Sequence, residues 1–521
     1  MKVEKLERLE TATAAASQAS AALKSATLEG DASVASSSSS SSPADGAFFQ
    51  YQRERIAHWD GVARWMRERK GLGGEYRRRL AEVYRFFVPP GKRVLEIGCA
   101  QGDLLAALEP STGVGLDFSA EMIEAARGKY PSLRFLRADA HDALDLEAEF
   151  DIIILSDVVN DLWDVQRVLE QVRRLSTPQT RLVLNFYSRL WELPLAAARR
   201  LGLARPNLDQ NWLTVEDIEG LLALADFEVI RRREEVLLPL PLPPVSTLAN
   251  RYLVKLWPFS QLAMTHFLVA RPVSNEASKT TRAPRVSVVV PARDEAGNVP
   301  AIFARVPEMG AGTELIFVEG GSRDDTYAAI EREIARRPGA SCLLLKQTGK
   351  GKGDAVRLGF AHATGDVLMI LDADLTVPPE DLPRFLDVLT SGKADFANGS
   401  RLVYPMEKEA MRFFNLLGNK FFSLAFSWLL GQSIKDTLCG TKVLWRSDYE
   451  TIAANRAYFG DFDPFGDFDL LFGAAKLNMK ILDLPVRYRD RTYGSTNIRR
   501  WSHGALLLRM VAFAARRIKF I

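Results

Sequence analysis

Two aspartates one residue apart follow an apolar run in the C-terminal half of the chain. Asp372 and Asp374 come at the end of Val367–Leu371, a run typical of a fully buried strand in an α/β sheet. Ligands of open α/β sheets bind at the carboxyl edge, where these strands end. Two carboxylates there, separated by the small Ala373, suit a hard divalent cation, Mg²⁺ or Mn²⁺, that holds a diphosphate.

A second group of residues with chemical potential lies near residue 96. The expected strand Arg93–Ile97 carries Glu96 and leads into a turn with Gly98 and Gly102. Glycines at a strand-to-helix turn let the backbone pass close to a ligand. Asp117 ends the next expected strand, where an acid can accept hydrogen bonds from both hydroxyls of a ribose. This pattern predicts a nucleotide-type site.

Two further strand ends extend the pattern. Asp139 follows the third expected strand and suits an adenine amino group, and the fourth strand ends at Ser156 and Asp157. In this order and spacing, the motifs resemble class I S-adenosylmethionine-dependent methyltransferases over roughly residues 75 to 270. The resemblance implies a Rossmann-like sheet with bound S-adenosylmethionine. Its methionine end would be lined by Glu96, Gly98 and Gly102, its ribose held by Asp117 and its adenine by Asp139, with Ser156 beside them.

One residue of the glycine turn departs from the family pattern. The third position is usually glycine, whereas this chain has Ala100, which is tolerable if its φ is negative. The methyl acceptor has no recognisable motif. By location, the candidates for the acceptor site are Asp157, Asn160, Asp161 and Tyr187. The alternative is that these residues cap strands and helices. Several aromatic residues either close over the site or pack in the core. They are His58, Trp59, Trp163 and Trp212.

The region around Asp372 contains a longer ordered series of motifs. They are VSVVVPARDEAGNVP, ELIFVEGGSRDDT, GKGKGD, LDADLT, NGSRLV, DTLCGTK, PFGDFDLLF and RYRDRTYGSTN. In this order they resemble the family 2 glycosyltransferases, most closely the dolichol- or polyprenyl-phosphate mannosyltransferase type, over about residues 284 to 505. The resemblance implies a GT-A fold, a nucleotide-sugar donor, a divalent metal and inversion at the anomeric carbon.

The same resemblance suggests roles for individual residues. Residues that would frame the donor's base and ribose are Pro291, Arg293, Glu295, Val318 and Glu319. A metal on Asp374, with Asp372 beside it, would neutralise the leaving nucleoside diphosphate. Plausible phosphate clamps are Arg401, Lys442 and Arg491. A lipid-phosphate acceptor needs no strong base, whereas a glycan hydroxyl would need a carboxylate, for which Asp467 and Asp469 are candidates.

Several positions depart from the glycosyltransferase pattern. Glu319-Gly320 replaces a frequent Asp-Asp, and Thr376 stands where the polyprenyl-phosphate type usually has glutamine. Asp294 replaces the usual asparagine before the glutamate, and Asn497 stands where lysine is common. The donor sugar, its base and the acceptor therefore stay open, and the metal shell lacks one ligand or completes itself with water.

Composition limits the class of protein. A net charge of +3 over 521 residues does not indicate a nucleic-acid partner, and 47% apolar with 26% charged residues is normal for a soluble globular chain. Three widely spaced cysteines fit a reducing cytosol better than a disulfide framework. Because no signal peptide and no sufficiently long apolar stretch occur, we expect a cytoplasmic protein without transmembrane helices.

The expected organisation is two α/β domains. Residues 1–46 form an Ala/Ser-rich disordered tail, 47–272 the methyltransferase domain, 273–283 a linker, and 284–521 the glycosyltransferase domain with a C-terminal amphipathic helix. The apolar segment Met411–Ser433 is interrupted by polar residues, so it is either a buried helix or an interfacial helix on the cytoplasmic face of a membrane.

The sequence thus predicts a bifunctional enzyme with both transferase activities. One alternative is a glycosyltransferase whose N-terminal domain binds S-adenosylmethionine without catalysis or only regulates, which Ala100 leaves open. A third hypothesis is a non-catalytic membrane scaffold, which Thr376 leaves open.

Overall fold

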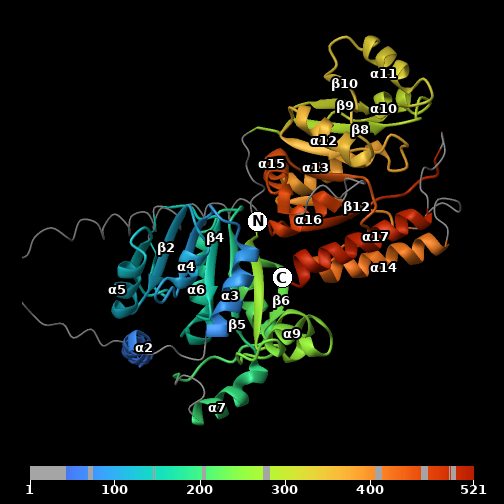
Figure 1. Ribbon diagram of the computed structural model, residues 1–521. Coiled ribbons are helices and arrows are strands. Elements are labelled where there is room, and N and C mark those ends of the chain that lie inside the picture. Colours follow the sequence, from blue (N-terminus) through green and yellow to red (C-terminus); the bar gives the residue numbers. More distant parts are fainter. Residues whose placement is uncertain are drawn as a thin grey trace, which may run out of the picture. The chain divides into compact units, whose positions relative to one another are not determined.

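The computed structural model describes residues 43–68, 74–144, 146, 148–201, 207–273, 282–404, 413–458, 468–491, 493 and 500–521 (Figure 1). Asp467, most of the predicted linker and nearly all of the predicted tail lie outside these ranges. Helix α2 (Pro43–Glu68) begins within the segment predicted as tail. The chain divides into the units Met1–Gln52 and Arg53–Ile521, and the second unit contains both sheets.

The first sheet has seven strands in the order β3-β2-β1-β4-β5-β7-β6. All neighbouring pairs are parallel except those of β7, which runs antiparallel to β5 and β6. Its strands are β1 (Arg93–Ile97), β2 (Thr112–Asp117), β3 (Arg134–Arg137), β4 (Ile152–Ser156), β5 (Arg181–Tyr187), β6 (Phe227–Glu235) and β7 (Thr265–Pro272). The prediction of a Rossmann-like α/β sheet is confirmed.

Helices cover this sheet and fix where its strands end. The central strands β1, β4 and β5 are buried along almost their whole length, as strands covered on both faces must be. Helix α6 (Val165–Arg174) buries Val165, Val168 and Val172 on one face, and Asp164 caps it by accepting from the Arg167 amide. The other helices of this region are α3 (Gly74–Phe87), α4 (Asp103–Ala107), α5 (Ala120–Lys129), α7 (Glu192–Arg200), α8 (Val215–Leu224) and α9 (Val245–Arg251).

The second sheet also has seven strands, in the order β10-β9-β8-β11-β13-β12-β14. Strand β13 runs antiparallel to β11 and β12, and the other pairs are parallel. The strands are β8 (Val286–Ala292), β9 (Thr313–Glu319), β10 (Cys342–Lys346), β11 (Val367–Ile370), β12 (Phe396–Ser400), β13 (Lys442–Trp445) and β14 (Ile481–Pro485). The first four correspond to the apolar runs VSVVV, ELIFV, CLLLK and VLMIL, which predict strands from the sequence alone. Strands β12 to β14 are short, and two of them carry a polar residue in their middle.

The helices of the second half alternate with these strands. They are α10 (Val299–Arg305), α11 (Thr326–Ala335), α12 (Lys352–His362), α13 (Leu382–Thr390), α14 (Phe413–Leu430), α15 (Arg446–Ala454), α16 (Phe468–Lys476) and α17 (Arg500–Ala514), followed by a π-helical turn, η7 (Ala515–Lys519). The antiparallel β13 matters most for function, because it carries the preceding segment DTLCGT to the edge where β8 and β11 end.

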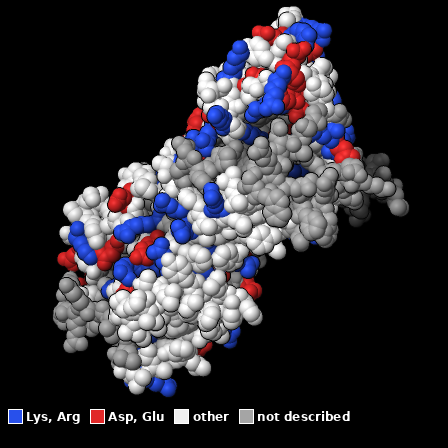
Figure 2. Space-filling model, turned by 45° about the vertical axis from the view of Figure 1, so that its right-hand side comes forward, with Lys and Arg blue, Asp and Glu red and all other residues white. Residues whose placement is uncertain are grey.

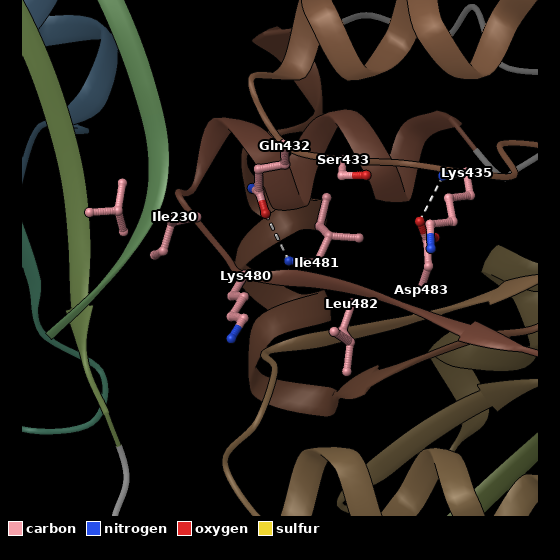
Figure 3. A pocket seen from close by; sticks show the side chains of 9 residues that line it. Ile230, Gln432, Ser433, Lys435, Lys480, Ile481, Leu482 and Asp483 are labelled. Carbon is pink, nitrogen blue, oxygen red and sulfur yellow. Dashed lines mark hydrogen bonds between the residues drawn. The ribbon is translucent and has the colours of Figure 1, made fainter. Parts of the chain in front are cut away.

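Buried ion pairs join residues of the two halves. Arg181 of β5 and Arg271 of β7 contact the two carboxylate oxygens of Asp395, with nitrogen–oxygen distances of 2.7 and 3.0 Å. A shallow pocket of about 290 Å³ lies between β6 and β14 (Figure 3). Its polar groups are paired with protein: Gln432 accepts from the Ile481 amide at 3.0 Å and Asp483 from the Lys435 amide at 2.6 Å. We therefore assign this pocket no ligand.

The apolar segment Met411–Ser433 contains helix α14. This helix buries Phe422, Phe426 and Leu429 and exposes Phe421 and Trp428. It therefore has both a core face and an exposed apolar face. Within the residues that the structure describes, no helix combines the length and the hydropathy needed to cross a bilayer.

Candidate active sites

The turn after β1 fits a closely approaching ligand. Gly98 and Gly102 have φ of 76° and 75°, which favours glycine at both positions. A Cβ at Gly98 would lie 2.8 Å from a Val158 methyl carbon, and one at Gly102 would lie 2.5 Å from the Phe135 ring. Side chains are therefore excluded at both positions, and the backbone lines the space beside the strand ends.

Ala100 does not have the conformation that the sequence analysis required. Its φ is 46°, in the left-handed region, so the negative φ that would make alanine easy to accommodate is not found. The conformation is held because the Ala100 amide donates to Asp117 Oδ2 at 2.9 Å. A second amide, that of Ser119, donates to Asp117 Oδ1 at 2.9 Å. Ala100 thus contributes to positioning Asp117, and the turn keeps the shape that glycine would give it.

Two carboxyl groups lie at this edge, and the buried one, Glu96, is partly unsatisfied. Burial raises the pKa of Glu96 to about 8, and burial raises the pKa of Asp117 to about 6. Glu96 Oε2 is buried and has no hydrogen-bond partner. A ligand with cationic and hydroxyl groups would pair with the unpaired Glu96 oxygen and bind beside the backbone of the turn. The residues present therefore fit S-adenosylmethionine. Glu96 would hold its amino-acid end, and Asp117 would hold its ribose.

Replacing Glu96 by glutamine should flatten the pH dependence of folding stability. Because the pKa of Glu96 is about 8 in the folded state against 4.5 ordinarily, the folded protein keeps a proton that the unfolded chain has lost. Stability of the ligand-free protein therefore falls as pH rises from about 4.5 to about 8, by at most about 1.4 kcal/mol per pH unit from this group.

The measurement is urea unfolding of the wild type and Glu96→Gln across that pH window. The variant should lose part of the slope and be the more stable protein near the upper end. Glu124→Gln, which changes an exposed glutamate on α5, should keep the wild-type slope. Equal slopes for wild type and Glu96→Gln would contradict the assignment.

The remaining predicted cofactor residues lie at neighbouring strand ends. Asp139 accepts from the His141 backbone amide at 2.9 Å, and its Oδ1 lies 2.6 Å from His141 Nδ1. Ser156 Oγ lies at the end of β4 and donates to Asn185 Oδ1 at 3.2 Å. The parallel strands therefore bring Glu96, Asp117, Asp139 and Ser156 to the ends of four adjacent strands, as the sequence predicted.

Asp157 is the centre of a polar cluster next to this turn. It has φ of 55°, a strained conformation of the kind that concentrates at functional sites. Tyr76 donates to Asp157 Oδ1 at 2.8 Å, and Asn185 Nδ2 donates to the same oxygen at 2.5 Å. The Tyr76 ring also stacks on Tyr187, with ring centroids 5.9 Å apart. Sequence reasoning proposed Asp157 and Tyr187 but missed Tyr76 and Asn185, which no motif marks.

Two other candidates from the sequence have structural partners. Asn160 is buried; its amide donates to the Asn211 carbonyl at 2.7 Å, and its oxygen accepts from the Tyr187 amide at 3.0 Å. Asp161 lies 3.7 Å from Arg55. Of the four aromatic candidates, Trp59 packs with Val62 and Ala63 of α2 and with Met122 beside the glycine turn. His58 lies next to it in α2, while Trp163 is exposed and Trp212 is half-buried.

The second sheet assembles the predicted donor-binding residues at one edge. β8 and β9 are parallel, and the register places Pro291 opposite Val318 and Ala292 opposite Glu319. Burial raises the pKa of Glu295 to about 7, although its hydrogen bond from Asn298 and the nearby Arg491 oppose the rise. Arg293 lies between these residues on the loop after β8.

Each aspartate after β11 has a cationic partner. Lys352 Nζ lies 2.6 Å from Asp372 Oδ1, and Arg491 Nη2 lies 2.5 Å from Asp374 Oδ2. Arg491 also contacts Glu295 Oε1 at 3.2 Å. Burial pushes the pKa of Asp372 upward, but the Lys352 ammonium outweighs it, so the net pKa is lowered. Asp372 therefore stays ionised, and both carboxylates lie in a site that already accommodates positive charge.

Neighbouring residues shape these carboxylates. Thr376 donates its hydroxyl to Asp374 Oδ1 at 2.8 Å and its amide to the same atom at 3.1 Å. A Cβ at Gly440 would overlap both the Asp372 carboxylate and the Lys352 ammonium, so glycine is needed there. Thr376, the departure noted in the sequence, thus orients the carboxylate of Asp374.

The donor set fits a divalent cation. Two carboxylates at one strand end, with a hydroxyl beside one of them, are the hard oxygen ligands that Mg²⁺ and Mn²⁺ prefer. Asp374 and Asp372 would hold the metal, and the metal would neutralise charge on a diphosphate. No group of three or more His, Cys, Asp or Glu with metal-binding geometry occurs among the described residues, so further ligands would come from substrate or water.

Three further predicted residues already have protein partners. Arg401 forms two hydrogen bonds to Asp436, at 2.7 and 2.9 Å. Lys442 is fully buried and donates to Asn398 Oδ1 at 3.1 Å and to the Cys439 carbonyl at 2.5 Å. Asp469 contacts Arg456 at 2.8 Å and Arg357 at 3.2 Å. Their roles as phosphate clamps and base stay predictions, and the structure surrounds each of them with protein contacts.

In the second sheet, sequence reasoning missed Lys352 as a functional candidate. It is the second lysine of GKGKGD, and it begins helix α12. The signal was available, because glycines around a lysine near a strand edge suit phosphate binding. The sequence analysis lists the motif but gives Lys352 no role, since its distance in sequence from Asp372 gives no sign of their contact.

Family models match both halves of the chain. Residues 72–232 match the model of a methyltransferase domain, and residues 287–452 match the model of glycosyl transferase family 2. The solved structure of a TehB-like SAM-dependent methyltransferase from Corynebacterium glutamicum is similar at 18% identity and a TM-score of 0.28, and the match covers 42% of this chain and 98% of that one.

Two curated relatives are sugar transferases. The chain is 30% identical over 215 residues to glycosyltransferase AglJ of Haloferax volcanii, covering 41% of this chain and 66% of the relative. It is 33% identical over 138 residues to dolichol-phosphate mannosyltransferase of Pyrococcus furiosus, covering 26% and 38%. The chain spans between about a third and two thirds of the length of the curated relatives it matches. The chain therefore joins a methyltransferase domain to a domain of glycosyl transferase family 2.

Proposed function

We propose that this chain carries two transferase activities. The C-terminal domain transfers a sugar, with inversion, from a nucleotide-sugar to a polyprenyl phosphate or a glycan and uses a divalent metal. The N-terminal domain transfers a methyl group from S-adenosylmethionine. The observation that supports the first activity best is the pair of carboxylates, Asp372 and Asp374, with Lys352 and Arg491 beside them.

Charge at this edge suits the departure of a nucleoside diphosphate. When the sugar leaves, negative charge develops on the diphosphate, and a metal on Asp374 and Asp372 would offset it. Lys352 and Arg491 already lie within hydrogen-bond distance of the carboxylates, so a small movement would bring either cation to a phosphate oxygen. Residues for the base and ribose are Pro291, Arg293, Glu295, Val318 and Glu319.

The contacts of Asp469 favour a phosphate as the acceptor. A hydroxyl acceptor needs a carboxylate to take its proton, whereas a lipid phosphate is ionised already. Asp469 is buried and lies between the guanidinium groups of Arg456 and Arg357, so it is poorly placed to act as a base. The relative from Pyrococcus furiosus is named a dolichol-phosphate mannosyltransferase, which agrees with this choice. The exposed apolar stripe of α14 would then provide peripheral contact with a membrane.

Glu96, Asp117 and Asp139 would orient the cofactor of the methyltransferase domain. Cofactor binding supplies an electrophilic methyl group, and the protein mainly has to align it with the acceptor atom. Asp157, held by Tyr76 and Asn185, is the group we propose for withdrawing a proton from that acceptor.

A product assay tests both activities on one preparation. The full chain is incubated with undecaprenyl phosphate, Mn²⁺ and a panel of labelled nucleotide-sugars, and label should pass into the organic phase. Omission of Mn²⁺ should abolish it. Calorimetry with S-adenosylmethionine tests the second site. Absence of label with every donor would overturn the glycosyltransferase proposal, and absence of heat would support a regulatory N-terminal domain.

A further inference from the structure

The methyltransferase domain has an apolar surface that its sheet does not explain. The chain between β6 and β7, residues 236–264, makes an excursion that contains α9. Its exposed side chains include Leu242, Leu248, Phe259, Leu262 and Trp257, which is 81% exposed. Exposed large apolar residues are ordinary when scattered, but a contiguous group marks a contact surface.

This excursion is a well-anchored structure. Asn250 is buried, and its side chain accepts from the amides of Leu237 and Leu238 and donates to the Leu238 carbonyl, each at 2.8 Å. Lys255 is buried and pairs with Glu235. Its apolar side chains are therefore held outward by a fixed backbone, and their exposure does not reflect a segment that failed to pack.

A second segment extends the same surface. Trp191 donates its indole N–H to the Leu262 carbonyl at 3.0 Å, which joins the excursion to the chain around α7. There Leu193 is 80% exposed and Leu190 is exposed as well. We call the exposed apolar side chains of residues 190–201 and 240–262 the apolar shelf.

The shelf is free of acidic residues over its main part. The sequence contains no Asp or Glu from residue 236 to 265, where Arg251 is exposed, while α7 begins with the exposed Glu192 and ends in Arg199 and the exposed Arg200. Figure 2 shows a wide area without charged side chains over the domain drawn below, where Figure 1 places α7 and α9. An apolar surface on which the arginines outnumber the single acid, Glu192, complements an anionic lipid surface.

The shelf also continues onto the apolar stripe of α14. Phe520 contacts the Tyr252 ring at a centroid distance of 5.3 Å and the Trp428 ring at 5.9 Å, and Arg251 donates to the Phe520 carbonyl at 2.9 Å. The chain from residue 498 to 521 likewise contains no Asp or Glu, and its Arg509 and Arg516 are exposed. Aromatic residues and arginines on one continuous surface are typical of membrane interfaces.

The shelf lies beside the edge of the sheet where the methyl acceptor would bind. β6 ends and β7 begins at the carboxyl edge of β5, because Tyr187 pairs with Thr265 and Thr265 with Glu235. Thr265 accepts a hydrogen bond from Asn185 at 3.2 Å, and Asn185 donates to Asp157. Contact of the shelf with a bilayer would therefore bring this edge close to lipid headgroups.

We propose that the apolar shelf docks the methyltransferase domain on an anionic bilayer and that the methyl acceptor is carried by a lipid. The part about the acceptor rests on the proposed methyltransferase function, whereas the docking does not. A second copy of the chain is the other possible occupant of such a surface, and the experiment distinguishes it.

Vesicle flotation of the full chain tests the docking. Wild-type protein should float with phosphatidylcholine vesicles that contain phosphatidylglycerol and much less with phosphatidylcholine alone. The double variant Leu193→Ser/Trp257→Ser should lose roughly tenfold or more in partition, since it removes the two most exposed shelf side chains. Leu224→Ser is the matched control, because Leu224 is 66% exposed but precedes β6 at the opposite edge of the sheet.

Two further arms separate the possible failures. Leu424→Ser alters the apolar stripe of α14. If this variant floats less well and the shelf variant floats like the wild type, the inference about the shelf is overturned. The proposed membrane contact of α14 would then still stand. Light scattering tests whether the chain forms a dimer. If only the shelf variant loses such a dimer, a second copy of the chain occupies the shelf, and the inference is overturned as well.

The acceptor is tested with labelled S-adenosylmethionine and a total lipid extract. Label should pass from the methyl group into the organic phase, and the shelf variant should lose most of this transfer while it still binds S-adenosylmethionine in calorimetry. Vesicle binding without labelled lipid would overturn the acceptor class alone. Failure of the wild type to bind S-adenosylmethionine would instead overturn the proposed methyltransferase function.

Discussion

Replacement of Asp374 by asparagine is expected to reduce glycosyl transfer by about 10³-fold, the effect of removing one main charge-stabilising group from an active site. Asparagine keeps the size of the side chain and can still accept the hydrogen bonds from Thr376, but it lacks the charge that would hold the metal. The fold should survive, because the buried contacts of β11 do not involve this side chain.

The measurement compares initial rates of label transfer at saturating Mn²⁺. Asp381→Asn, which changes an aspartate that pairs with Arg384 at the surface of the same domain, should keep the wild-type rate. Calorimetry with S-adenosylmethionine should give the same affinity for all three proteins. A rate for Asp374→Asn within a few fold of the wild type would remove Asp374 from the metal site.

Replacement of Asp117 by alanine is expected to weaken binding of S-adenosylmethionine by about 100-fold or more, the loss of roughly 3 kcal/mol that a charged hydrogen-bonding group supplies. The carboxylate accepts from the Ala100 and Ser119 amides, so it shapes the glycine turn, and we propose that it also holds the ribose. Alanine removes both effects, while glycosyl transfer should not change.

Calorimetry measures this affinity directly, and the exposed Asp142→Ala is the control. Since alanine also leaves two amides without acceptors, Asp117→Asn is the second variant. Asparagine can accept from only one of them through its oxygen, so it should bind with intermediate affinity. Wild-type affinity in both variants would show that the ribose is held elsewhere.

The parts of the fold that the sequence predicted are those with long apolar strands. β4 and β11 have continuous apolar runs, and a carboxylate directly after such a run has to lie at the sheet edge. Asp157, Asp372 and Asp374 were therefore placed correctly at strand ends. The strand β12, FANGS, is short and shows no alternation of apolar and polar residues. Only its pairing with β13 and β14 makes it a strand.

The parts of the sites that the sequence did not predict depend on contacts between distant residues. Lys352 meets Asp372 because α12 begins where β11 ends, and nothing in the local sequence reports this. Arg401 is an arginine in a recognised motif, yet its guanidinium pairs with Asp436. Ala100 shows a different failure, since the hydrogen bond from its amide to Asp117 holds a φ that alanine avoids in isolation.

The contacts of Arg491 have a consequence for how the glycosyltransferase domain folds. Arg491 is separated by 117 residues from Asp374 and by 196 residues from Glu295, so the loops that bring these groups together are among the longest in the domain. Closing long loops is slow and is rewarded only after the intervening strands have paired. The donor site is therefore a late product of folding, and a nascent chain acquires it only once the last motif has left the ribosome.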